Sequence, residues 1–121
     1  MSTTTSILTR DKLYIGGEWV DPAGTGMVDV LNPTTEEVIG RVPEGNAEDA
    51  DRAVRAARAA FDSWSQVSPH ERAGYCAAIA AQLDERGDEL AALITSEMGM
   101  PVGLSRMIQV GLPSMTFGAI P

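Results

Sequence analysis

The chain has 121 residues, a mass of 12.8 kDa and a formal net charge of -8, from 9 Lys+Arg against 17 Asp+Glu. This length allows one domain at most, and 44% hydrophobic with 21% charged residues argues against wholesale disorder or a fibrous repeat. The excess of acids also disfavours nucleic acid as a partner, because such binding depends on Lys and Arg neutralising phosphates.

Cysteine and histidine are scarce, which excludes two further classes. With one cysteine, Cys76, and one histidine, His70, the chain forms no internal disulfide and no His/Cys zinc site. The N-terminus has only Ile7 and Leu8 as bulky apolar residues, so it lacks the apolar stretch of a signal peptide. No run approaches the ~18 apolar residues of a membrane span. We therefore expect a cytoplasmic protein with no membrane partner.

The first third of the chain predicts a flexible tail followed by short strands. Residues 1–12 are rich in Ser and Thr and lack periodicity, which is typical of a frayed terminus. Gly16-Gly17 is a two-residue hairpin signal, and Asn32-Pro33 marks a further break because the residue before proline avoids the helical region. The expected strands are 13–15, 18–20, 27–31 and 37–42.

From Asn46 the pattern changes to helices. Asn46 with Asp49 at the third helical position predicts an N-terminal cap, and an apolar stripe follows as far as Phe61 and Trp64. The alanines of this stripe suit close packing against a sheet or another helix. A second helix opens at Ser68-Pro69 with a capping box and is expected to stop at Gly87.

A third helix is expected from Asp88 to the stop signal at Gly99, with Pro101 two residues on. The stretch 102–121 is mainly apolar and small, and its only charge is Arg106. It predicts a buried helix that is kinked or interrupted near Pro113, and its burial requires a partner surface outside these residues.

The residues alone supply no active site. Cys76 falls on the apolar stripe of a helix, where a free cysteine usually behaves as a small hydrophobe, and no histidine pairs with it. His70 lies in the first turn of a helix and is expected in solvent. Gly24-Thr25-Gly26 is followed by Asp29 rather than by the glycine of a phosphate-binding turn.

Several motifs in register nevertheless resemble one family. They are the hairpin Ile15-Gly16-Gly17-Glu18-Trp19, the Asn32-Pro33 turn leading to Glu37-Val38-Ile39, the helix from Ala53 to Trp64, and the ending Glu97-x-Gly99-x-Pro101. Over about Leu13 to Pro101 the chain looks like the N-terminal portion of the aldehyde dehydrogenase superfamily. The resemblance implies an α/β fold, with short antiparallel strands and then three or four helices flanking an incomplete Rossmann-type domain over 13–121.

Members of this family are NAD(P)-dependent, several times longer, and oxidise aldehydes to carboxylic acids through a cysteine thiohemiacetal, hydride transfer and hydrolysis. The resemblance places the catalytic cysteine, the general-base glutamate and the nucleotide-binding glycines beyond the equivalent of Pro121, and Cys76 matches none of them. It therefore implies a fragment that is inactive alone, binds NAD or NADP weakly if at all, and belongs to a homo-oligomer acting on a small aldehyde.

The resemblance also implies an incomplete monovalent-cation site. Its ligands here would be the backbone carbonyl of Leu31, just before the Asn-Pro turn, and the side chain of Glu97. A hard cation prefers such oxygen ligands, and a further ligand would come from the missing part. The lysine of the family motif is replaced by Met100, so no role is transferred to that position.

Two alternatives stay open. One is a non-enzymatic helical module, for assembly or regulation, that docks through residues 102–121. The other is a split enzyme whose remaining part is a separate polypeptide that complements this chain. The sequence does not distinguish these from a fragment, and it carries no residue that decides the aldehyde or the choice between NAD and NADP.

Overall fold

The computed structural model describes residues 7–120, which divide into two compact units. The first comprises residues up to Leu31 together with Glu36–Gln66, and the second comprises Asn32–Thr35 together with the chain from Val67 onward. Each unit is described by itself below. The α/β fold class predicted from the sequence is confirmed, with short strands followed by helices.

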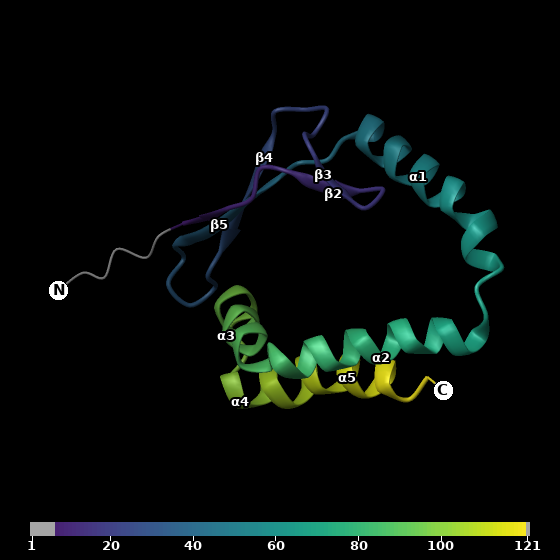
Figure 1. Cartoon of the computed structure of the whole chain (residues 1–121). Coiled ribbons are helices and arrows are strands. Elements are labelled where there is room, and N and C mark those ends of the chain that lie inside the picture. Colours follow the sequence, from purple (N-terminus) through teal and green to yellow (C-terminus); the bar gives the residue numbers. More distant parts are fainter. Residues whose placement is uncertain (1–6, 121) are drawn as a thin grey trace. The chain divides into compact units, whose positions relative to one another are not determined.

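The first unit contains a three-stranded sheet of order β1-β5-β4 (Figure 1). The strands β4 (Met27–Leu31) and β5 (Val38–Pro43) are antiparallel, and β1 (Leu8–Thr9) pairs with β5 in parallel. Gly40 lies opposite Leu8 and is buried, and a Cβ there would come within 3.3 Å of the Leu8 carbonyl oxygen. The predicted tail over 1–12 is thus wrong at Leu8–Thr9, because backbone pairing with β5 orders two residues that carry no sequence signal. Residues 1–6 lie outside the described part.

The first unit also contains an isolated hairpin of β2 (Leu13–Ile15) and β3 (Glu18–Val20), with the predicted bounds. Gly16 and Gly17 have φ angles of 65° and 87°, so both turn positions lie in the left-handed region that favours glycine. The rings of Tyr14 and Trp19 pack across the strands with centroids 5.1 Å apart. The predicted hairpin is confirmed.

The helix α1 (Ala47–Ser65) begins at the predicted cap. The Asn46 side chain accepts hydrogen bonds from the backbone of Glu48 and Asp49, and the Asp49 carboxylate accepts one from the Asn46 backbone. The later part of its apolar stripe is not buried within this unit, since Val54, Phe61 and Trp64 are 67%, 54% and 48% exposed. The prediction of close packing therefore holds only near the hairpin.

The second unit is helical. Its elements are α2 (Pro69–Glu85), α3 (Gly87–Met98), α4 (Val102–Leu104), the π-helix η1 (Ser105–Val110) and α5 (Gly111–Gly118). The Ser68 hydroxyl caps α2 by accepting from the Glu71 N–H. Gly99 ends α3 at φ 72°, as predicted, and a Cβ there would lie 3.2 Å from the Pro33 ring.

One predicted helix boundary needs correction. Gly87 begins α3 and does not adopt the left-handed conformation of a helix cap, and the Arg106 guanidinium occupies the space beside it that a Cβ would fill. The predicted interruption of the last helix near Pro113 is present as the π-helix η1, which ends at Val110 and continues directly into α5, where Pro113 removes one N–H donor.

The core of the second unit is small. Ala91 and Val110 are 1% and 2% exposed, and α5 packs along α2 (Figure 1). Two serines are buried with them: Ser105 shares a hydrogen bond of 3.1 Å with Thr95, and Ser114 donates one of 2.7 Å to Asp84. The prediction of a buried final helix is therefore right for one face only. No helix among residues 7–120 combines the length and apolarity needed to cross a membrane.

Candidate functional site

Cys76 and His70 do not form a catalytic pair in the structure. Both lie on α2, where Cys76 is half-buried and His70 is exposed in the first turn. Residues six apart on an α-helix do not share one face. Across residues 7–120, no three His, Cys, Asp or Glu side chains gather in a way that would hold a metal ion.

A polar cluster gathers where β5 leads into α1, centred on the buried carboxylate of Asp49. Asp49 Oδ1 accepts a hydrogen bond of 2.9 Å from the Ala23 N–H, and Arg52 lies 3.3 Å from the same oxygen. Arg52 also donates to the Asp21 carbonyl oxygen at 3.1 Å. The cluster thus fastens the turn before β4 to the start of the helix.

The hydrogen bond from Ala23 holds the pKa of the Asp49 carboxyl below its ordinary value of 3.8. The Asn46 N–H and the Arg52 guanidinium lower this pKa further, whereas burial acts in the opposite direction. The carboxylate is therefore ionised at neutral pH. Its hydrogen bonds to the Ala23 and Asn46 N–H groups make Asp49 an anchor for the backbone.

The hydrogen bonds of this cluster also bear on whether the N-terminus of α1 could bind a nucleotide phosphate. Helix N-termini attract phosphates through free N–H groups. Here the Glu48 and Asp49 N–H groups are already bonded to the Asn46 side chain, and the Asp49 carboxylate adds negative charge. The junction of β5 and α1 is therefore unsuited to a pyrophosphate.

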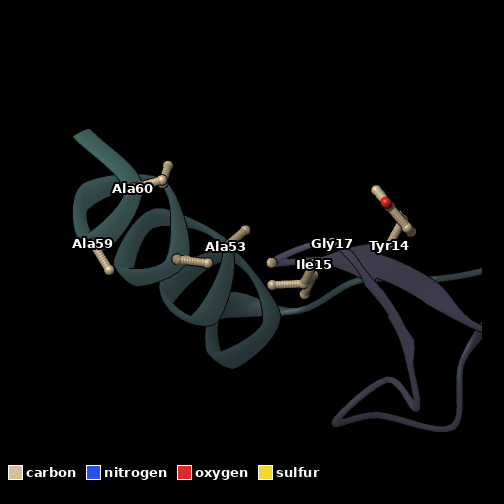
Figure 2. A pocket seen from close by; sticks show the side chains of 9 residues that line it. Tyr14, Ile15, Gly17, Ala53, Ala59 and Ala60 are labelled. Atoms are coloured by element: carbon tan, nitrogen blue, oxygen red, sulfur yellow. The ribbon is translucent and has the colours of Figure 1, made fainter. Parts of the chain in front are cut away.

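A shallow hollow lies between the β2–β3 hairpin and α1. Figure 2 shows Ile15 and Gly17 of the hairpin beside the part of α1 that carries Ala53. Its walls are mostly alanine, and the Tyr14 side chain points away from α1 (Figure 2). Because it offers no charged group and no nucleophile, the hollow suits packing and not chemistry.

The second unit contains one long-range ion pair beside Gly87. Arg106 of η1 donates to the Asp88 carboxylate at 3.1 Å, and its guanidinium covers the Gly87 backbone. Nearby, Arg86 and Glu89 form a two-fold hydrogen-bonded pair that lowers the pKa of Glu89. The Arg106–Asp88 pair joins η1 to α3, whereas the Arg86–Glu89 pair is local to the start of α3.

The predicted cation ligands fall on different units. Leu31 ends β4 in the first unit, and Glu97 lies exposed in the last turn of α3 in the second. Their pairing stays a prediction. The clusters at Asp49 and Arg106 were missed by sequence reasoning, because each joins residues far apart in the chain without any motif.

Fold and site together define an α/β segment in which the polar clusters at Asp49 and Arg106 fasten backbone elements. A model of the aldehyde dehydrogenase family matches residues 19–117. The 3-succinoylsemialdehyde-pyridine dehydrogenase of a Pseudomonas species is 40% identical over 102 residues, covering 84% of this chain and 20% of that protein.

Solved structures agree with this match. Aldehyde dehydrogenase from Bartonella henselae superposes with a TM-score of 0.88 and 35% identity, covering 92% of this chain and 23% of the other. The Mycobacterium tuberculosis aldehyde dehydrogenase, complexed with NAD+, gives 0.85 and 39% identity over 95% of this chain and 25% of the other. The chain belongs to the aldehyde dehydrogenase family, and it spans about a fifth of the length of the curated relatives it matches.

Proposed function

We propose that this chain is the N-terminal scaffold portion of an NAD(P)-dependent aldehyde dehydrogenase that oxidises an aldehyde to a carboxylic acid. The observation that carries the proposal is the joint agreement of sequence and structure: the family match spans residues 19–117, and one superposition covers 92% of the chain at a TM-score of 0.88. Relatives with this fold were crystallised with NAD+, and one of them, aldehyde dehydrogenase C of Pseudomonas syringae, also with octanal.

The start of α1 does not fit the pyrophosphate of a dinucleotide. The turn from β5 into α1 has its first N–H groups bonded to Asn46 and carries the ionised Asp49, so it would repel a pyrophosphate. Half-buried Cys76 and exposed His70 lie six residues apart on α2, so they do not form a nucleophile and base pair on one helix face. We therefore assign this chain a structural role, and assign NAD or NADP binding and the covalent chemistry to the rest of the enzyme.

A second part of the proposal concerns the cation site. The Leu31 carbonyl oxygen and the Glu97 carboxylate are the hard oxygen donors that a monovalent cation prefers. In a longer chain they would hold the cation together with a ligand outside these 121 residues. We further propose a cytoplasmic, homo-oligomeric enzyme that acts on a small aldehyde and has neither nucleic acid nor a membrane as partner, as the net charge of -8 favours.

The purified chain tests its own part of this proposal. It is incubated with NAD+ or NADP+ and a panel of aldehydes. NAD(P)H formation is followed by its absorbance at about 340 nm. We expect the rate of a heat-treated control, and no saturable cofactor binding by calorimetry. Turnover above that control would contradict the assignment.

The second candidate function is a non-enzymatic assembly module. Its supporting observation is the exposed apolar side of the last helix, where Met107 and Met115 are 64% and 71% exposed. Such a module needs a self-sufficient core, so its isolated chain should unfold in one cooperative thermal transition. A broad, non-cooperative melt would contradict this candidate.

A further inference from the structure

We draw no further inference here: the strongest candidate, the apolar groove that Tyr75, Ile79 and Leu90 line along α2 and the start of α3, carries nothing because no contact in the described part of the chain shows what covers it.

Discussion

Val110→Ala should be the most damaging simple truncation in the second unit. Val110 is 2% exposed and ends the π-helix at the point where the last helix meets its neighbours. The change removes two buried methylene equivalents, which costs about 1.6 kcal/mol in transfer free energy at ~0.8 kcal/mol each. The cavity left behind adds to this, so we expect a loss of about 2–3 kcal/mol in the free energy of unfolding.

This loss is measured by urea unfolding, with the helical signal of the second unit followed by circular dichroism at about 222 nm. With a slope of about 1–3 kcal/mol per molar urea, the midpoint should fall by roughly 1–2 M. Met115→Ala is the matched control, since its side chain is 71% exposed on the same helical stretch and its loss should cost less than about 0.5 kcal/mol in the isolated chain. Equal midpoints for the two variants would refute the assignment of Val110 to the core.

Three further substitutions test the anchors and the backbone. Asp49 has a folded pKa below 3.8, so its ionised form stabilises the fold above that pH, and this contribution is lost as the pH falls through the folded value. Asp49→Asn should therefore lower Tm at pH 7 and flatten its fall in acid, whereas an unchanged calorimetric pH profile would argue against the clamp to Ala23. Gly99→Ala should cost about 1–3 kcal/mol in unfolding free energy, because φ is 72° and the new Cβ would press on Pro33. Gly74→Ala, where a Cβ meets open space, should instead raise it by about 0.5–1 kcal/mol, and a loss in thermal melts would contradict that reading.

Local signals explain why most elements could be predicted. The β2–β3 hairpin follows from two glycines in a row, and the start of α1 follows from Asn46 with Asp49 three residues on, because each signal acts between near neighbours in the chain. The same holds for the end of α3 at Gly99. Such signals need no knowledge of the rest of the fold.

The parts that could not be predicted depend on distant neighbours. Leu8 becomes a strand residue only because Gly40 leaves room for its carbonyl, and Asp49 becomes a clamp only because Ala23 lies across from it. Gly87 predicts the end of a helix in the sequence, whereas in the structure it begins α3 and the Arg106 guanidinium fills the space that a Cβ would occupy. Each requires the tertiary arrangement to be known first.

The candidate site residues also divide into those set by local sequence and those set by tertiary contacts. The helical placement of Cys76 could be predicted from the apolar stripe, and the structure places it half-buried on α2. The last stretch could be recognised as apolar, but which of its side chains point outward depends on the π-helix at Ser105–Val110. The α-helical period alone does not predict the extra residue that a π-turn inserts.

The most direct test captures the native protein from its source cells with an antibody against residues 46–64 and measures its aldehyde-dependent reduction of NAD+ and NADP+, with its intact mass determined on the same sample. The account predicts a species well above 12.8 kDa that turns over aldehydes, while the recombinant 121-residue chain does not. A native species of 12.8 kDa without turnover would contradict it, and so would turnover by the recombinant chain alone.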